Sequence, residues 1–319
     1  MSDAGSQRPA TVVVNLPGGG PGGGLVPQVQ EVLGDGEVVV AIDDPRAGDA
    51  DVLLALSRDR ATLEPSAVPN VRWLHAFSTG VDGFPLDVVG DRTFTCSRGA
   101  NAVPIAEFVL ASMLAFAKRF PTTWITEPPE HWNLASLDVL AGRTVGLVGV
   151  GAIGTEVARR ALAFDMRVLA YRRRPEPPPI PGIERCSELE ELLGQSDHVV
   201  IAAPATPATH HMIGAAALAA IKPGAHLVNI ARGSLVDQDA LIAALDDGRV
   251  ACASLDTVDP EPLPAGHPLY AHPSVRLSAH VSWSAPDTLG PTLALFAENV
   301  RRYRAREPLH GIVDVDAGY

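Results

Sequence analysis

Residues 143–154 read RTVGLVGVGAIG, an apolar run that leads directly into three glycines, Gly149, Gly151 and Gly154. The next residues, TEVARRALAF (155–164), have helical spacing, and RVLAY (167–171) reads as a second strand. Strand, glycines, helix and strand thus follow one another within about thirty residues, which is the context that a GxGxxG dinucleotide fingerprint requires. The stretch therefore predicts a dinucleotide-binding α/β fold.

Each glycine of this fingerprint has its own physical task. Gly149 permits the tight turn, Gly151 lets the backbone approach a pyrophosphate, and Gly154 lets helix and strand pack closely. The amides and the positive dipole at the helix N-terminus, around Ala152 and Ile153, suit phosphate groups. A glycine-rich turn that binds no ligand is the alternative interpretation.

The strand and helix pattern then repeats along the chain. Strand-like runs HVVIAAP (198–204), HLVNIA (226–231), ACASLD (251–256) and VRLSAHV (275–281) alternate with helix-like runs. With the first two strands they make six strands between about 144 and 281, the number in two mononucleotide-binding halves. The pattern predicts a doubly wound parallel sheet.

The first hundred residues predict a second, smaller α/β domain. Short apolar runs such as TVVVNL (11–16) and DVLLALS (51–57) alternate there with breaks rich in proline and glycine. The run PGGGPGGG (17–24) lacks the Lys-Ser/Thr ending of a phosphate-binding P-loop. We interpret it as a flexible loop, with a mobile flap on the substrate side as the alternative.

Composition excludes several classes of protein. The 319 residues suit two domains, and 46% hydrophobic with 19% charged residues indicates a folded globular chain. A formal charge of -12 argues against binding to nucleic acid or to an anionic membrane surface. Cys96, Cys186 and Cys252 show no metal-binding spacing and indicate reduced core residues of a cytoplasmic protein, so we predict no metal site.

One helix is predicted to be apolar around most of its circumference. It covers 104–120, and its apolar run at 108–117 is too short to span a bilayer. The stretch MSDAGSQRPATVVVNLP (1–17) lacks a cationic start followed by a long apolar run, so we do not expect it to act as an export signal. Such a helix needs cover on all sides, which a second domain or a second subunit would provide.

Residues 171–175, YRRRP, bear on the choice of cofactor. Arg172 stands 172 - 149 = 23 residues after Gly149, at the position where an acid usually binds the adenosine ribose of NAD. Guanidinium groups suit the 2′-phosphate of NADP(H), which would repel a carboxylate. We therefore predict NADP(H), bound through Arg172, Arg173 and Arg174, with NAD(H) possible and a solvated turn as the alternative.

Three later segments carry side chains suited to proton transfer and anion binding. Arg232 lies in VNIARGSLVD, Glu261 in LDTVDPEPLP and His280 in SAHVSW. Each follows a predicted strand of the second half, so each is expected near the nicotinamide end of the crevice. Taken singly, they could be a surface ion pair, a loop carboxylate and a buried core histidine.

With these segments in view, nearly the whole chain resembles the D-isomer-specific 2-hydroxyacid dehydrogenase family. STGVD (78–82), ANAVPIAEF (100–108), HW (131–132) and PATPAT (204–209) fall in the family's order with the motifs quoted above. The resemblance implies an α/β architecture of two Rossmann-like doubly wound parallel-sheet domains. The cofactor domain, 99–286, would be inserted in a flavodoxin-like substrate domain made of 1–98 and 287–319.

The resemblance also implies roles for single residues. Arg232 would clamp the substrate carboxylate and polarise the 2-oxo group, His280 would be the acid/base, and Glu261 would hold and charge the imidazole. The backbone at Thr79 and Gly80 would bind the carboxylate as well. The substrate set is thus Thr79, Gly80, Arg232 and His280, and the cofactor set is Gly149, Gly151, Ala152, Ile153, Gly154, Arg172, Arg173, Arg174, Pro204, Ile230, Ala231, Asp256 and His280. Asp256 would meet the nicotinamide carboxamide, and the helix at 104–120 would build a homodimer.

The implied activity is the interconversion of a small 2-oxo acid and its D-2-hydroxy acid, on the glyoxylate/hydroxypyruvate reductase side because the ribose acid is absent. Ser282 and Trp283 replace the family's usual small residues and are expected to narrow or reshape the pocket. A redox-sensing dinucleotide-binding regulator and an NAD-dependent 2-hydroxyacid dehydrogenase stay open. A formate-type dehydrogenase is disfavoured, because that branch resembles a Gln partner to the histidine, in contrast to Glu261.

Overall fold

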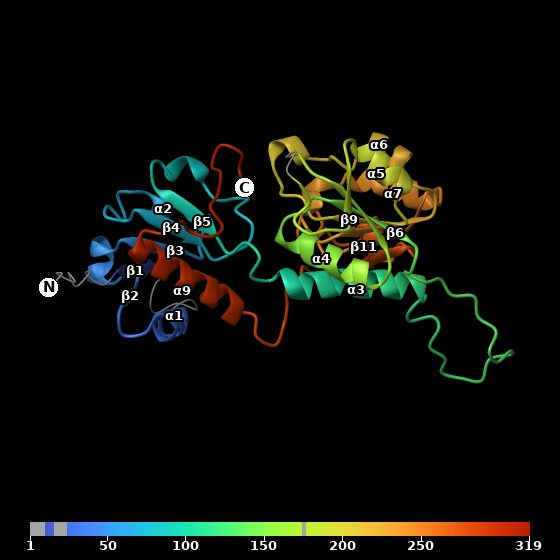
Figure 1. Ribbon diagram of the computed structural model, residues 1–319, viewed down its shortest axis with the longest axis horizontal. Helices are drawn as coiled ribbons and strands as arrows, with labels where there is room; N and C mark the ends of the chain where they lie inside the picture. The colour runs from blue at the N-terminus through green and yellow to red at the C-terminus, as the bar shows by residue number, and fades with distance from the viewer. Residues whose placement is uncertain (1–9, 16–23, 174–176) are drawn as a thin grey trace. The chain divides into compact units, whose positions relative to one another are not determined.

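The computed structural model describes residues 10–15, 24–173 and 177–319, which divide into two compact units (Figure 1). The first unit is Met1–Asn101 with Pro286–Tyr319, and the second is Ala102–Ala285. The chain therefore leaves the first unit, completes the second, and returns. The boundaries expected at 98/99 and 286/287 lie close to those of the two units.

The second unit is built on a seven-stranded parallel sheet of order β12-β11-β10-β9-β6-β7-β8. The strands are β6 (Thr144–Val148), β7 (Arg167–Tyr171), β8 (Ile183–Cys186), β9 (His198–Ile201), β10 (Ala225–Asn229), β11 (Val250–Leu255) and β12 (Val275–Leu277). From β6 the chain winds first towards β8 and then, starting again at β9, towards β12. The doubly wound fold class is confirmed, and the switch point where such sheets bind ligands lies between β6 and β9.

The prediction of six strands in this unit was wrong by one, because β8 has no apolar pattern. Its two inner residues, Glu184 and Arg185, are exposed, and only its end residues are buried. β8 is an edge strand that pairs with β7 alone, and Arg167 on β7 forms an ion pair with Glu184 at 2.6 Å. Exposed charges are common on edge strands because they discourage further pairing.

Helices cover both faces of this sheet (Figure 1). On one face α5 (Leu189–Gln195), α6 (Ala215–Ala220) and α7 (Gln238–Asp246) enclose one core, and on the other α3 (Ala102–Ala117) and α4 (Ala152–Ala163) enclose a second. Val199 belongs to the first core and Val200 to the second, as the alternation along a strand requires. A short helix, α8 (Pro268–Ala271), precedes β12.

α3 ends at Ala117, three residues before the predicted end of the helix. Arg119 takes a φ of +53° and Pro121 follows, and both features break helical geometry. α3 buries Ile105, Val109 and Met113 against its own domain. Within the described residues, no helix combines the length and apolar character needed to cross a membrane.

The first unit has a five-stranded parallel sheet of order β2-β1-β3-β4-β5, the flavodoxin-like order. Its elements are β1 (Thr11–Val14), α1 (Leu25–Leu33), β2 (Val38–Ala41), η2 (Pro45–Asp49), β3 (Val52–Ala55), α2 (Arg60–Leu63), β4 (Trp73–Ala76), η3 (Leu86–Val88), β5 (Thr93–Cys96) and α9 (Gly290–Ala305). Of the glycine-rich run at 17–24, only Gly24 is among the described residues, so its interpretation as a loop or flap stays a prediction.

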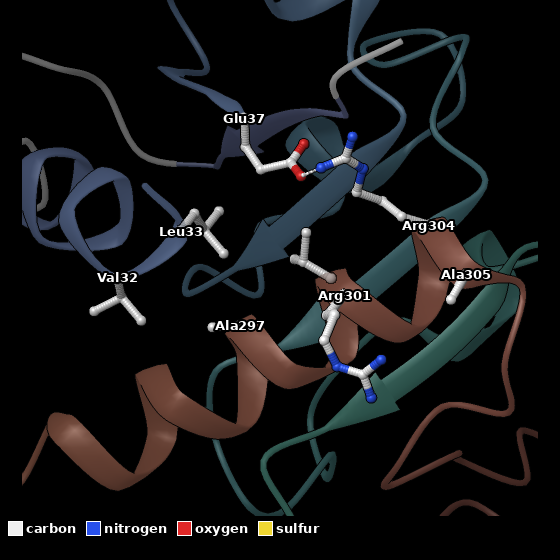
Figure 2. Close-up of a pocket in the computed structure, with 8 residues that line it drawn as sticks. Val32, Leu33, Glu37, Ala297, Arg301, Arg304 and Ala305 are labelled. Atoms are coloured by element: carbon white, nitrogen blue, oxygen red, sulfur yellow. Dashed lines mark hydrogen bonds and ion pairs between the residues drawn. The ribbon is translucent and has the colours of Figure 1, made fainter. Parts of the chain in front are cut away.

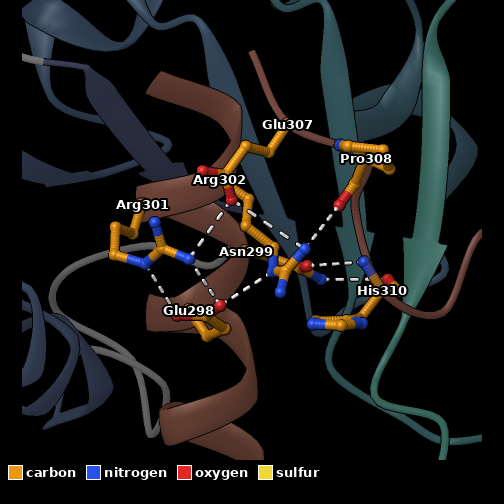
Figure 3. Close-up of polar contacts among 7 residues, drawn as sticks. All are labelled: Glu298, Asn299, Arg301, Arg302, Glu307, Pro308 and His310. Atoms are coloured by element: carbon orange, nitrogen blue, oxygen red, sulfur yellow. Dashed lines mark hydrogen bonds and ion pairs between the residues drawn. The ribbon is translucent and has the colours of Figure 1, made fainter. Parts of the chain in front are cut away.

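The C-terminal segment is an integral part of the first unit. Phe296 of α9 packs against the fully buried Trp73 of β4, with ring centroids 5.7 Å apart. Asn299, also fully buried, donates to the carbonyl of His310 at 3.0 Å and accepts from its amide at 2.8 Å (Figure 3). These bonds hold the returning chain on α9, and Ile312 then pairs with Thr95 at the edge of β5.

A cavity of about 460 Å³ lies between α1 and α9, with Leu33, Ala297 and Arg301 in its wall (Figure 2). At one end the Glu37 carboxylate forms an ion pair with Arg304 and accepts the amide of Ala10 at 2.6 Å. Ala10 and Glu37 directly precede β1 and β2. The cavity is therefore at the amino ends of these strands, opposite to the end where parallel sheets form their ligand sites.

Candidate active site

The glycine turn after β6 has two closely packed glycines and one that faces open space. Gly149 has a φ of +98°, and a Cβ there would lie 2.8 Å from the amide nitrogen of Ala203. A Cβ on Gly154 would lie 2.5 Å from the carbonyl oxygen of Gly149. A Cβ on Gly151 would meet nothing within 4 Å. Gly149 and Gly154 are thus needed by the fold itself, whereas Gly151 borders a space that a ligand can enter.

The start of α4 borders the same space. Gly151 is its N-cap, and among the described residues neither a capping side chain nor an acid in the first turn occupies this end of the helix. The backbone amides at Ala152, Ile153 and Gly154 are therefore available to an anion, and the helix dipole adds a partial positive charge. These features fit the pyrophosphate of a dinucleotide.

Arg172 and Arg173 directly follow β7, beside the glycine turn. The amide of Gly149 donates to the carbonyl of Tyr171 at 2.9 Å, so the last residue of β7 is tied to the turn. Arg172 is half-buried and donates to the carbonyl of Pro177 at 3.3 Å, while Arg173 is exposed. Arg174 lies outside the described residues.

Pro204, Ile230 and Ala231 lie at the carboxyl ends of β9 and β10, and of these two strands β9 is the neighbour of β6. The carbonyl of Pro204, after β9, accepts the hydroxyl of Thr209 at 2.7 Å. Ile230 and Ala231 follow β10, and the side chain of Ile230 is buried in the core. Only the backbone of Ile230 can therefore face a cofactor.

Arg232 is positioned by two residues that the sequence analysis did not single out. Asn229, buried at the end of β10, donates to the carbonyl of Arg232 at 2.9 Å and accepts from the amide of Ala231 at 3.1 Å. A Cβ on Gly233 would lie 1.9 Å from the carbonyl carbon of Val258, so this glycine brings the arginine loop against the loop after β11. The signal was present in the sequence as an Asn and a Gly flanking Arg232.

His280 and Glu261 form a direct pair. His280 Nδ1 and Glu261 Oε2 are 2.8 Å apart, and both side chains are 38% exposed. The other oxygen of Glu261 accepts the amide of Val258 at 3.2 Å, which fixes the carboxylate. Nε2 of His280 has no hydrogen-bond partner in the described part of the chain. The imidazole is therefore oriented through one nitrogen and can exchange a proton with a ligand through the other.

Asp256 anchors the loop that carries His280. Its carboxylate is 2% exposed and accepts from the Ser278 hydroxyl at 2.6 Å and from the amides of Val281 and Ser282, each at 2.9 Å. Burial alone would raise the pKa of Asp256, but the hydrogen bonds from Ser278, Ser282 and Val281 together outweigh it and lower the pKa. Asp256 is therefore an ionised tether at the end of β11.

Ser282 and Trp283 differ in their surroundings. Ser282 is buried, with its amide on Asp256, whereas Trp283 is 41% exposed and its indole N–H donates to the carbonyl of His280 at 2.7 Å. Only Trp283 therefore presents a large surface beside His280.

Thr79 and Gly80 follow β4 in the first unit, at the carboxyl end of its sheet. The Ser78 hydroxyl donates to the carbonyl of Gly80 at 2.6 Å, which shapes this turn. The guanidinium of Arg58, after the neighbouring β3, lies 5.4 Å from the centre of the Phe84 ring and adds a cation beside the same loop. No sequence pattern marked Arg58 as a candidate. The grouping of Thr79 and Gly80 with residues of the second unit stays a prediction.

The polar groups of the second unit together can bind an anion and transfer a proton. Arg232 supplies a cation and His280 supplies an exchangeable proton. The turn at Gly151 supplies backbone amides that can bind phosphate groups. In the ranges that the structure describes, no three His, Cys, Asp or Glu side chains are grouped so that they could hold a metal ion.

Comparison with known proteins agrees with this fold. The family model described as D-isomer specific 2-hydroxyacid dehydrogenase, NAD binding domain, matches residues 110–282. The glyoxylate reductase of Thermofilum pendens is 35% identical over 264 residues, which cover 79% of this chain and 78% of that protein. Glyoxylate/hydroxypyruvate reductase B of Yersinia pseudotuberculosis is 34% identical over 73% of this chain and 74% of its own length.

A solved structure extends the similarity over both units. The D-isomer specific 2-hydroxyacid dehydrogenase from Xanthobacter autotrophicus Py2, in complex with NADPH and MES, is 27% identical, with a TM-score of 0.84 over 98% of this chain and 100% of that one. The chain belongs to the D-isomer specific 2-hydroxyacid dehydrogenase family, and it is an NAD(P)-dependent dehydrogenase of that family.

Proposed function

We propose that this protein is an NADP(H)-preferring reductase that interconverts a small 2-oxo acid and its D-2-hydroxy acid, with glyoxylate and hydroxypyruvate as the first substrates to test. The observation that carries the proposal is the 2.8 Å pair of His280 and Glu261 in the same unit as the glycine turn and Arg232. Two similar proteins, the glyoxylate reductase of Thermofilum pendens and the glyoxylate/hydroxypyruvate reductase B of Yersinia pseudotuberculosis, support the choice of substrates.

In the proposed reaction, the bound nicotinamide supplies the hydride. Arg232 binds the substrate carboxylate and polarises the 2-oxo group, so negative charge that develops on the oxygen is stabilised. His280 donates its Nε2 proton to that oxygen, and Glu261 accepts a hydrogen bond from Nδ1–H and stabilises the imidazolium. The backbone amides at Thr79 and Gly80 are proposed as further donors to the substrate carboxylate.

The preference for NADP(H) is supported by Arg172 and Arg173 at the end of β7. A 2′-phosphate bound there would accept charge-assisted hydrogen bonds from the guanidinium groups. The similar structure from Xanthobacter autotrophicus was solved with NADPH.

We further propose a homodimer built through α3 and the segment that follows it. Val103 on α3 is 46% exposed, and the segment at 121–139 exposes Trp124, Trp132 and Leu134 by 68%, 70% and 76%. Large apolar side chains in such numbers are typical of surfaces that a partner covers. Light scattering coupled to size exclusion measures the mass of the assembly. The location in the cytoplasm stays a prediction.

The test of the function is NADPH-dependent reduction of glyoxylate and hydroxypyruvate, followed by the loss of absorbance of the reduced cofactor. We expect turnover with at least one of them and, with hydroxypyruvate, D-glycerate as the product, whereas the glycolate formed from glyoxylate has no stereocentre. If the protein binds the dinucleotide but turns over neither substrate, a redox-sensing regulator becomes the favoured function. The assembled Glu261–His280 pair argues against that alternative, since a regulator has no need of it.

A further inference from the structure

We infer that Trp283 is a positioning residue for the proposed acid/base His280 and that it acts through the backbone carbonyl of His280. The inference rests on the proposed function, because it needs His280 to transfer the proton. Its basis is the 2.7 Å hydrogen bond from the indole Nε1–H of Trp283 to the carbonyl oxygen of His280.

The backbone of His280 is in a conformation that needs support. Its φ is +53°, in the left-handed region that residues with a Cβ seldom adopt. Such a conformation persists where surrounding contacts over-determine it, and it occurs often at active sites. In this conformation the Cα–Cβ bond sets the direction from which the imidazole reaches Glu261.

The contacts that hold this conformation come from two residues. The amide of His280 donates to the carbonyl of Asp256 at 2.9 Å, and the carboxylate of Asp256 accepts the next two amides. The remaining backbone group, the carbonyl of His280, has the indole of Trp283 as its partner. Asp256 thus fixes the backbone amides of the loop, and Trp283 fixes the carbonyl between them.

Trp283 is well placed to apply this constraint. The amide of Ser284 donates to the carbonyl of Val281 at 2.9 Å, which closes a turn that contains Trp283 and folds its side chain back towards His280. Without the indole N–H, the carbonyl of His280 can turn to water. The residue can then relax towards ordinary φ values, and Nδ1 moves away from Glu261.

A loss of this kind should appear in kcat and not in KM. Arg232 binds the substrate carboxylate and does not depend on Trp283, whereas proton transfer in the transition state depends on the direction of Nε2. Trp283→Phe keeps an aromatic ring beside His280 and removes only the donor. Phe164→Leu is the control, because Phe164 is an aromatic residue of the same unit that is 42% exposed, at the C-terminal end of α4.

The experiment is a double-mutant cycle on the NADPH-loaded enzyme, with Trp283→Phe, Glu261→Gln and the double variant, together with Tm and the Kd for NADPH. We expect Trp283→Phe to lower kcat by about three- to tenfold, the effect of one hydrogen bond, with KM, Kd and Tm little changed. In the Glu261→Gln background the same substitution should have less than about half this effect on a logarithmic scale, because the two residues act on one imidazole. Phe164→Leu should match the wild type.

Three results would overturn the inference. The first is an unchanged kcat in Trp283→Phe. The second is a rise in KM alone, which would mean that Trp283 only lines the pocket. The third is an equal effect of Trp283→Phe in the wild type and in Glu261→Gln, which would mean that Trp283 acts independently of the Glu261–His280 pair. His280→Ala separates this failure from that of the function. If His280→Ala is inactive while Trp283→Phe equals the wild type, only the inference fails, and if His280→Ala stays active, the proposed proton donor and the inference fail together.

Discussion

The two halves of the second unit build their parts of the site by different means. On the β6–β7 side, the proposed pyrophosphate contacts are backbone amides beside Gly151, where an added Cβ would meet nothing within 4 Å, and the proposed 2′-phosphate contacts are the guanidinium groups of the two arginines after β7. On the β10–β12 side the proposed contacts come from side chains that other side chains hold, as Glu261 and Asp256 hold His280 and its loop. We therefore expect that a single substitution on the β6–β7 side can alter cofactor preference without disturbing its neighbours. A substitution on the β10–β12 side is expected to disturb several hydrogen-bonded residues at once.

The largest effect is expected on the β10–β12 side, from substitution of His280. His280→Ala removes the proton donor, so kcat should fall by roughly 10²- to 10⁴-fold, the usual contribution of general acid catalysis. The Kd for NADPH, measured by fluorescence, should stay within a few fold, because the phosphate seat at α4 is untouched. Parallel loss of cofactor binding and turnover would show that the two sides are not separate.

A smaller effect is expected on the β6–β7 side, from substitution of Arg172 and Arg173. Arg172→Asp with Arg173→Ala should move the ratio of kcat/KM for NADPH over NADH by roughly ten- to a hundredfold, since a charge-assisted hydrogen bond contributes about 1.5–3 kcal/mol. Arg249→Ala, a surface arginine paired with Asp247, is the control and should leave the ratio unchanged. If the ratio of kcat/KM for NADPH over NADH does not change in the double variant, Arg172 and Arg173 belong to a solvated turn and do not bind the 2′-phosphate.

Two glycines of one turn should respond in opposite ways. Gly151→Ala fits the empty protein, because its φ is -88° and its Cβ is free, but the methyl group enters the ligand space. The Kd for NADPH should rise by an amount equivalent to about 1–2 kcal/mol, roughly five- to thirtyfold, with Tm unchanged. Gly149→Ala should instead lower Tm, because of its positive φ and its contact with Ala203. If Gly151→Ala lowers Tm as much as Gly149→Ala does, the space beside Gly151 is not open.

The smallest effect concerns the core that supports both sides. His198 and His226 are buried with their Nδ1 atoms 3.2 Å apart, and burial lowers the pKa of His198 from 6.5 to about 4 and that of His226 well below 6.5. Both are neutral in the folded state near pH 7, so the unfolded chain binds more protons as pH falls below 6.5. Stability is therefore lost below pH 6.5, and for His198 the loss continues down to about pH 4. Each should cost about 1 kcal/mol at pH 6 relative to pH 7.5.

Denaturant unfolding at several pH values measures this loss, and His198→Asn should flatten the dependence. The ratio of NADPH to NADH use should not change over the same range, because neither histidine lies at the carboxyl ends of the strands. A stability that stays constant from pH 7.5 to 5 would mean that these histidines are not buried in neutral form.

The sequence predicted the parts of the molecule that are set by local pattern. Gly149, Gly151 and Gly154 follow their strand directly, so spacing alone predicted the turn. The order of the strands predicted that Arg232, Glu261 and His280 follow β10, β11 and β12. The sequence did not predict β8, whose edge position removes the apolar pattern. Nor did it predict that Asp256 anchors the His280 loop, because that contact joins residues 22 to 26 positions apart.

The way the chain returns to the first unit has a consequence for its biosynthesis. The second unit is complete in sequence at Ala285, whereas the first still lacks α9 and the segment that Asn299 clamps. Until α9 emerges from the ribosome, Trp73 lacks its contacts with Phe296 and Tyr303. The domain that is translated first is therefore the one that finishes folding last, and its nascent sheet must be kept from aggregation while the whole cofactor domain is made.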